Sequence, residues 1–176
     1  MVANTMGLQD LANIGQVIGA IAVVVSLFYV ASQIRQNTNA VRSATAQSVH
    51  ENFATWYHLL AEDAEVSRIA VDGLRDYASL SEVDKARFIA IFMAFLSYSQ
   101  NAFIKWREGS LSYSLWSARE LLMMNLVSAP GGRAFWEERG YLFGSELRDY
   151  IDNDLMRRKP HPNAVPMGAF GIGEDA

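Results

Sequence analysis

The feature that most constrains this chain is an uncharged run of 24 residues from Leu11 to Ile34, bounded by Asp10 and Arg35. Most of its residues are Ile, Val, Leu, Phe, Ala or Gly. As an α-helix rising ~1.5 Å per residue, the run is about 36 Å long, against roughly 30 Å of hydrocarbon in a bilayer. Apolar residues occupy every face of such a helix, whereas a helix at the surface of a soluble core carries one apolar stripe. The sequence therefore predicts a transmembrane helix over residues 11–34.

A cleaved signal peptide is the main alternative for this run, because Val30-Ala31-Ser32 has the small residues of a cleavage site. Signal peptides begin with positive charge, whereas residues 1–10 contain no Lys or Arg. The run also exceeds the usual length of about 7 to 15 apolar residues in such a peptide. We therefore favour an uncleaved anchor that follows a short N-terminal segment, residues 1–10.

Charges beside the run predict its orientation. Arg35 and Arg42 lie on the C-terminal flank, and no basic residue lies on the N-terminal flank. Because basic flanks stay on the cytoplasmic side, the rest of the chain is expected in the cytoplasm and the N-terminus outside.

Small residues form one stripe along the predicted membrane helix. Gly15, Gly19, Ala22 and Ser26 are spaced by four, three and four residues, so they share a helix face. Such a stripe lets two helices approach closely in lipid, where close packing replaces the hydrophobic drive. We expect self-association or contact with another membrane helix, although glycine is also common in membrane helices that make no such contact.

The remaining sequence predicts one all-α domain, a helical bundle over residues 35–158. The chain has 176 residues, 51% of them apolar, which is enough for a single packed core. Val49, Phe53, Trp56 and Leu60 recur at helical spacing and indicate that the membrane helix continues to about residue 61 with one apolar face. No alternating strand pattern bounded by turn residues is present. Residues 159–176, rich in Pro and Gly, are predicted to be a mobile tail.

Boundaries of the later helices follow from capping and turn residues. Helices are expected over 64–77, after Asp63, and over 82–107, after a capping box formed by Ser79 and Glu82. Ser112 and Ser145 are expected to cap two more helices, and residues 129–132, Ala-Pro-Gly-Gly, to form a turn. Predicted core positions of this C-terminal half include Leu115, Trp116, Leu122, Leu126, Phe135, Trp136, Leu142, Leu147, Tyr150, Ile151 and Leu155.

A second uncharged run, Phe88 to Ile104, is the alternative that would change the topology, because it is nearly long enough to span a membrane. Its centre, residues 97–101, is the contiguous polar block Ser-Tyr-Ser-Gln-Asn. Lipid would leave these hydrogen-bonding groups unsatisfied. We therefore interpret the run as the central core helix of the bundle.

Two segments resemble a widespread group of uncharacterised bacterial proteins. One runs from Ile18 through Gln33-Ile34-Arg35-Gln36-Asn37-Thr38, and the other is the Pro-Gly-Gly-Arg-x-x-Trp-Glu segment, here residues 130–137. The resemblance spans roughly residues 14–152. It implies a bacterial source, one N-terminal anchor and a helical domain, without an assigned activity or a catalytic residue. The predicted location is therefore the bacterial inner membrane, with a single pass.

A search for catalytic chemistry finds weak signals only. His58 and Glu62 lie four apart on one helix face, with Glu65 near, but no Glu is followed three residues later by His as carboxylate-bridged di-iron bundles require. Gly131-Gly132-Arg133 before a helix is a weak anion-site candidate. No P-loop, dinucleotide-binding turn or nucleophile elbow is present, and the chain has no cysteine. We expect no enzyme activity, no cofactor and no bound metal.

Two functional hypotheses remain. A net charge of -4 argues against nucleic acid as a partner, because such proteins normally carry a basic excess on one face. We favour a membrane-anchored helical accessory or interaction protein whose partners are the lipid bilayer and another protein or a second copy of the chain. The alternative is a ligand-sensing or enzymatic domain with a pocket near His58, Glu62, Gln100 and Asn101.

Overall fold

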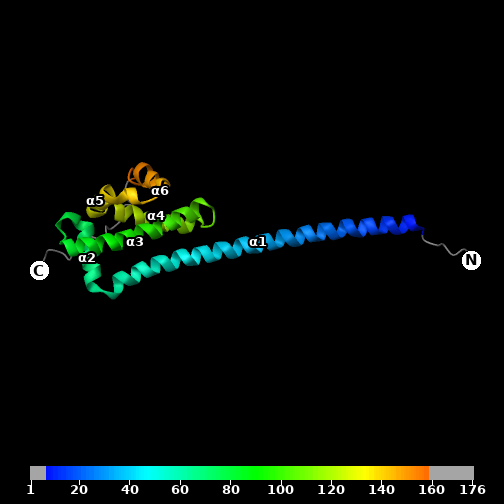
Figure 1. Cartoon of the computed structure of the whole chain (residues 1–176), viewed down its shortest axis with the longest axis horizontal. Helices are drawn as coiled ribbons and strands as arrows, with labels where there is room; N and C mark the ends of the chain where they lie inside the picture. The colour runs from blue at the N-terminus through cyan, green and yellow to red at the C-terminus, as the bar shows by residue number, and fades with distance from the viewer. Residues whose placement is uncertain (1–6, 159–176) are drawn as a thin grey trace, which may run out of the picture. The chain divides into compact units, whose positions relative to one another are not determined.

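The computed structural model describes residues 7–158, and across this range the protein is all-α, without a strand (Figure 1). The fold class predicted from the sequence is confirmed. Contacts divide the chain into two units, with unit 1 ending at Ser43 and unit 2 beginning at Ala44. The helices are α1 (Leu8–Glu62), α2 (Ala64–Arg75), α3 (Glu82–Arg107), α4 (Tyr113–Ser128), α5 (Pro130–Arg139) and α6 (Ser145–Tyr150). Shorter turns are η1 (Tyr77–Ser79), η2 (Gly140–Leu142) and the π-helical η3 (Ile151–Leu155).

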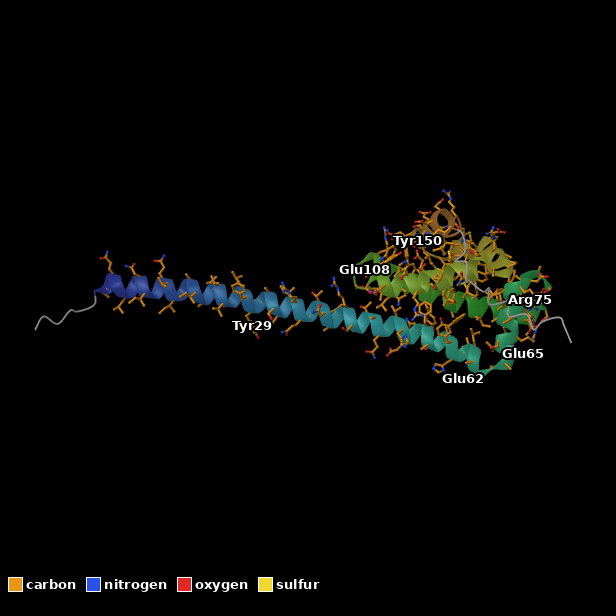
Figure 2. All side chains as sticks on the ribbon, turned by 180° about the vertical axis from the view of Figure 1, so that it is seen from behind. Tyr29, Glu62, Glu65, Arg75, Glu108 and Tyr150 are labelled. Atoms are coloured by element: carbon orange, nitrogen blue, oxygen red, sulfur yellow. The ribbon has the colours of Figure 1, made fainter. Side chains whose placement is uncertain are left out.

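Unit 1 is the first part of α1, and it contains the apolar run. The described side chains of residues 8–43 are all exposed, so no packed core forms within this unit. In Figure 2 the side chains around Tyr29 project on all sides of the helix. The stretch is long and apolar enough to cross a membrane. Helix continuity through residue 62 agrees with the absence of Pro between residues 8 and 62.

In unit 2 the last part of α1 packs against α3. Val49, Phe53 and Trp56 are buried on the face predicted from their spacing. The Trp56 indole N–H donates to the carbonyl of Ile91 at 3.2 Å, and the ring of Phe53 lies 6.1 Å from that of Phe95. A residue further back along α1 thus contacts a residue further forward along α3, so the two segments are antiparallel.

Two aspartates set the chain reversals around α2. Asp63 caps α2 by accepting hydrogen bonds from the backbone N–H groups of Glu65 and Val66 at 2.8 and 3.3 Å. The helix ends at Arg75, two residues before the predicted end. Asp76 has an extended backbone there and caps η1 instead, through the N–H of Ala78 at 3.1 Å.

The predicted capping box of Ser79 and Glu82 is wrong. The Ser79 hydroxyl donates to the carbonyl of Asp76 at 2.9 Å, because it belongs to the η1 turn that Asp76 closes. Ser81 caps α3 in its place, and its hydroxyl accepts a hydrogen bond from the N–H of Asp84 at 3.1 Å. One face of α3 is buried through Phe88, Phe92, Phe95, Leu96, Ser99 and Phe103, which supports its interpretation as the core helix of the bundle.

The predicted turn over residues 129–132 is also wrong, because Pro130, Gly131 and Gly132 form the first turn of α5. Proline suits the first position of a helix, where its missing N–H would have no intrahelical partner. A Cβ on Gly131 would lie 1.7 Å from the carbonyl oxygen of Gly73 in α2, and one on Gly132 would lie 1.9 Å from that of Leu126 in α4. The glycines therefore permit close packing of helix backbones rather than a reversal of the chain.

The C-terminal part differs from the sequence prediction in three details. Gly144, not Ser145, is the N-cap of α6, and the helix passes at Ile151 into η3, where the N–H of Met156 donates to the carbonyl of Ile151 at 2.9 Å. Leu115 and Leu142, predicted to be buried, are 47% and 51% exposed. Beside them, Trp116 of α4 is fully buried as predicted, and Phe143, which was not predicted to be buried, stacks its ring 5.6 Å from that of Trp136.

Aromatic rings dominate the core of unit 2. Phe135 of α5 lies 4.8 Å from Phe92 and 6.4 Å from Phe88, both in α3. At the other end of α3, the rings of Trp106 and Trp116 stack at 5.5 Å. These contacts join α3, α4 and α5 into one bundle.

Candidate functional site

The apolar stretch of unit 1 is the first candidate site, because its large apolar side chains are exposed. Ile18, Val24 and Phe28 are 61%, 52% and 74% exposed. Contiguous exposed apolar surface of this extent marks a membrane or protein contact in natural proteins. Unit 1 thus offers a surface for lipid or for another apolar helix.

The small-residue stripe lies within this stretch. Gly15, Gly19, Ala22 and Ser26 are all helical and exposed, and nothing lies within 4 Å of where a Cβ at either glycine would be. The Ser26 hydroxyl donates to the carbonyl of Ala22 at 2.8 Å, so its hydrogen bond is satisfied inside the helix. That arrangement lets Ser26 lie in lipid without a partner from another chain.

Arg35 and Arg42, the residues used to predict orientation, are both exposed on α1. Between them the chain has three amide side chains and one hydroxyl, that of Thr38. The Thr38 hydroxyl donates to the carbonyl of Ile34 at 2.9 Å. A change from apolar to polar side chains at this point is what the end of a membrane span requires.

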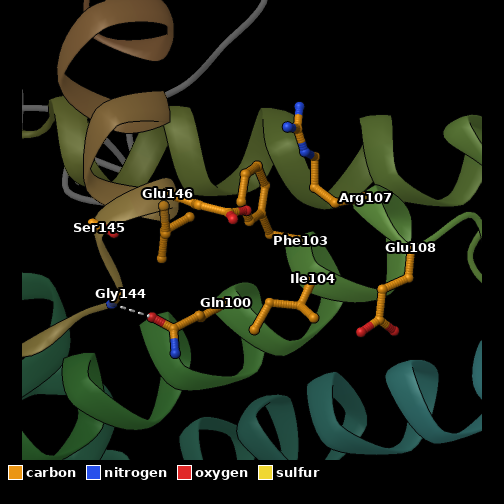
Figure 3. Close-up of a pocket in the computed structure, with 9 residues that line it drawn as sticks. Gln100, Phe103, Ile104, Arg107, Glu108, Gly144, Ser145 and Glu146 are labelled. Carbon is orange, nitrogen blue, oxygen red and sulfur yellow. Dashed lines mark hydrogen bonds between the residues drawn. The ribbon is translucent and has the colours of Figure 1, made fainter.

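In unit 2 the second candidate is a cleft of about 570 Å³ between α3 and the start of α6 (Figure 3). Phe103, Ile104 and Leu147 supply apolar lining. The side-chain oxygen of Gln100 accepts a hydrogen bond from the N–H of Gly144 at 2.8 Å and fixes the position of the chain at the start of α6. Gln100 is half-buried on α3, and this hydrogen bond satisfies its side-chain oxygen.

Charged groups line the other end of this cleft. Figure 3 shows Arg107 and Glu108 at the end of the cleft away from Gly144, with Glu146 reaching across from α6. Lys105 and Glu108 form an exposed ion pair at 3.4 Å. Arg107, Glu108 and Glu146 thus place charges of both signs beside the apolar lining of the cleft.

The third candidate is a cluster around a buried carboxylate. Glu120 of α4 is only 7% exposed, and it accepts hydrogen bonds from the Tyr150 hydroxyl and from the Arg158 guanidinium at 2.9 Å. Arg158 also donates to Asp154 at 3.2 Å. Burial lowers the pKa of Arg158, but its bond to Asp154 and the charge of Glu120 outweigh this and leave the pKa raised. The cluster attaches the last described turn of the chain to α4, which is a structural role.

A fourth cluster joins α2 to the start of α3 at the surface. Arg68 forms ion pairs with Glu65 at 2.6 Å, Asp72 at 3.0 Å and Asp84 at 3.2 Å. The hydrogen bonds that Arg68 donates to these carboxylates raise the pKa of Arg68, and its bond to Glu65 lowers the pKa of Glu65. Because the groups are open to solvent, salt screens the cluster and it adds little to stability.

The weaker sequence candidates do not assemble into sites. The side chains of His58 and Glu62 are 73% and 78% exposed with 4.0 Å between them, and neither lines the cleft that contains Gln100. Within residues 7–158, no group of three potential metal ligands is present. Gly131 and Gly132 are buried against helix backbones, and Arg133 is exposed. The structure thus brings together neither the His58 pocket nor an anion site at Gly131.

Comparison of the chain with protein-family models, curated proteins and solved structures finds no match. The resemblance to an uncharacterised bacterial group therefore stays a prediction from sequence.

Two important residues were not identified from the sequence. Gly73 lies inside an otherwise regular helix pattern, and an isolated glycine there is a signal for close packing. Glu120 lies among apolar residues of α4, which is a signal for a buried acid, but its partners are 30 and 38 residues away in the chain. Both residues support the fold and neither contributes a reacting group.

Proposed function

We propose that this protein is a membrane-anchored helical accessory or interaction protein. α1 anchors it in the bacterial inner membrane through residues 11–34, and unit 2 presents a rigid surface in the cytoplasm. The observation that carries this proposal is the apolar stretch of unit 1, none of whose described side chains is buried and for which lipid is the natural environment. The resemblance noted in the sequence supports the bacterial location.

The energetics of insertion support an anchor. Ten Ile, Val, Leu and Phe residues lie between Ile14 and Ala31. At about 0.3 to 0.6 kcal/mol each, they favour insertion by roughly 3 to 6 kcal/mol. Arg35 and Arg42, with no basic residue before Leu11, support the cytoplasmic location of unit 2.

The partner side of the proposal rests on the small-residue stripe. Gly15, Gly19, Ala22 and Ser26 leave a flat face where another helix can approach closely. A second copy of the chain and a helix of another membrane protein both fit this face. Among the described residues of unit 2, the charged clusters at Glu120 and Arg68 have structural roles.

Co-purification tests the proposal. Tagged and untagged full-length chains are co-expressed in a bacterial membrane, extracted in mild detergent and captured through the tag, and the eluate is analysed by mass spectrometry. We expect recovery of the untagged copy or of one further protein in a fixed ratio. Recovery of the tagged chain alone, at every detergent concentration, would contradict an interaction role.

A ligand-sensing function is the second candidate, and the cleft beside Gln100 is the observation that favours it. Thermal-shift measurements on purified protein with a panel of amphipathic metabolites test this function. A Gln100→Ala variant that keeps its fold but loses a shift seen with the wild type would support it. No shift with any compound would remove it.

A further inference from the structure

The turn between α3 and α4 lies at the end of unit 2 where the chain enters from unit 1. Phe53 of α1 meets Phe95 of α3 in the antiparallel pairing described above. Nine residues back along α1 is Ala44, and nine residues forward along α3 is Ile104, so these two residues lie at about the same level of the bundle. Helix α3 continues past this level to Arg107, and the turn to α4 follows.

Little chain separates this end of unit 2 from the proposed membrane span. Ile34, the last residue of the apolar run, is ten residues before Ala44, and the chain between them is helical. Ten helical residues cover about 15 Å, and even a fully extended chain would cover no more than ~36 Å. The headgroup layer itself adds roughly 5 to 7 Å on each side of the hydrocarbon. Chain length therefore keeps this end of unit 2 near the headgroups.

Exposed apolar side chains gather in this segment. Tyr113 and Leu115, in the first turn of α4, are 61% and 47% exposed, and Ile104 is 40% exposed. The ring of half-buried Trp106 lies 6.2 Å from that of Tyr113. Tyrosine and tryptophan, with an apolar body and one polar group, are the residues that membrane interfaces favour.

The turn is closed by backbone hydrogen bonds, and it carries two basic residues, Lys105 and Arg107, and one acid, Glu108, which pairs with Lys105 at 3.4 Å. Gly109 has a φ of +74°, which only glycine adopts without strain, and the N–H groups of Ser110 and Leu111 both donate to the carbonyl of Lys105, at 3.0 and 2.9 Å. A turn closed in this way loses little conformational entropy on binding. Basic residues close to the surface are attracted by anionic headgroups.

We propose that the α3–α4 segment, residues 104–115, contacts the headgroup layer of the bilayer that holds α1, with Tyr113 and Leu115 inserted among the headgroups. Unit 2 is then held at the membrane surface at two points, the entry of α1 and this segment. The inference rests on the proposed anchor. Lipid is the proposed contact of the exposed side chains in this segment, because the short connection from residue 34 keeps the segment within reach of the bilayer.

Spin labels on single cysteines test this contact in the full-length protein. The chain has no cysteine of its own, so a label can be introduced at Y113C, L115C, V83C or V24C, one site per protein. Val83 is the matched control: it is 63% exposed and lies near the opposite end of α3. Val24 reports on the anchor itself. Each protein is reconstituted in vesicles of phosphatidylethanolamine and phosphatidylglycerol, and collisions of the label with oxygen and with a water-soluble nickel chelate are compared.

We expect the ratio of oxygen to nickel-chelate collisions at residues 113 and 115 to be several-fold higher than at residue 83, and highest at residue 24. A high ratio at 24 with equal, low ratios at 113, 115 and 83 would overturn the headgroup contact and leave the anchor intact. Low collision rates with both reagents at 113 and 115 would mean that protein covers the segment, which also overturns it. A low ratio at residue 24 would instead contradict the anchor, and the headgroup contact with it.

Discussion

Replacement of Gly131 by alanine should destabilise unit 2, because the new Cβ has no space. It would lie 1.7 Å from the carbonyl oxygen of Gly73 and 2.8 Å from its carbonyl carbon. An ordinary contact begins at about 3.4 Å, so α5 and α2 must separate by ~1.7 Å. Backbone atoms on both sides leave no flexible side chain to absorb this shift, and the rings of Phe135 and Trp136 move with α5.

The magnitude follows from two opposing effects. Overpacking of this kind costs roughly 3 kcal/mol or somewhat more, at the upper end of the usual range. Alanine regains about 1 kcal/mol through its helix propensity. We therefore expect a net loss of about 2 to 3 kcal/mol in the free energy of unfolding. For a bundle of this size that lowers Tm by roughly 6 to 15 °C.

Thermal and urea unfolding of the purified full-length protein, followed by circular dichroism, measures this loss. Gly144→Ala is the matched control, because a Cβ there would meet only the Gln100 side chain at 3.5 Å. We expect that control to cost no more than about 1 kcal/mol, which is the preference of an N-cap for glycine over alanine, since alanine adopts the φ of -59° found at Gly144 without strain. A Gly131→Ala protein as stable as the wild type would refute the close packing of α2 and α5.

Three further predictions concern topology, helix contact and the buried acid. A C-terminal fluorescent protein that folds only in the cytoplasm should fluoresce, and a C-terminal alkaline phosphatase should be inactive; the opposite pattern would show that the two-arginine bias gives the wrong orientation. Gly19→Ile should reduce self-association of the isolated segment in a genetic assay, or remove a partner from the purified chain. The control Ala20→Ile, about 100° away around the helix, should do neither. Equal behaviour of the two variants would exclude the stripe as a contact face. Glu120→Ala should lower the free energy of unfolding by about 2 to 3 kcal/mol, because it removes two hydrogen bonds and leaves the Tyr150 hydroxyl without its acceptor. Glu146→Ala, at an exposed position, should have little effect. Similar values for the two variants in urea unfolding would contradict this role of Glu120.

Features that depend on neighbouring residues in the chain could be predicted from the sequence. The apolar run at 11–34 follows from composition and the buried face of Val49, Phe53 and Trp56 from periodicity, and the structure has both. Asp63 was identified as a cap because a cap and its helix lie within a few residues. The all-α class follows from the sum of such local signals.

Features that depend on residues far apart in the chain could not be predicted from the sequence. Pro130-Gly131-Gly132 is typical of a turn until Gly73, 58 residues earlier, is known to lie against it. Leu115 and Trp116 are adjacent and both were predicted to be buried, and only the fold decides that the tryptophan packs on Trp106 of α3 while the leucine stays exposed. The acceptor role of Glu120 likewise depends on Tyr150 and Arg158, which the fold brings to it. In each case a long-range contact overrides a local preference.

The central claim is that residues 11–34 hold the protein in a membrane, and alkaline carbonate extraction of membranes tests it most directly. Wild-type protein and a Val24→Arg variant are compared at equal expression. Arginine at the middle of the span costs about 2.5 to 3.5 kcal/mol, which is comparable with the roughly 3 to 6 kcal/mol that the ten large apolar residues contribute. We predict that the wild type stays in the membrane pellet and that the variant is released or degraded. Release of the wild type by carbonate, or equal retention of both proteins, would contradict a single anchor at residues 11–34.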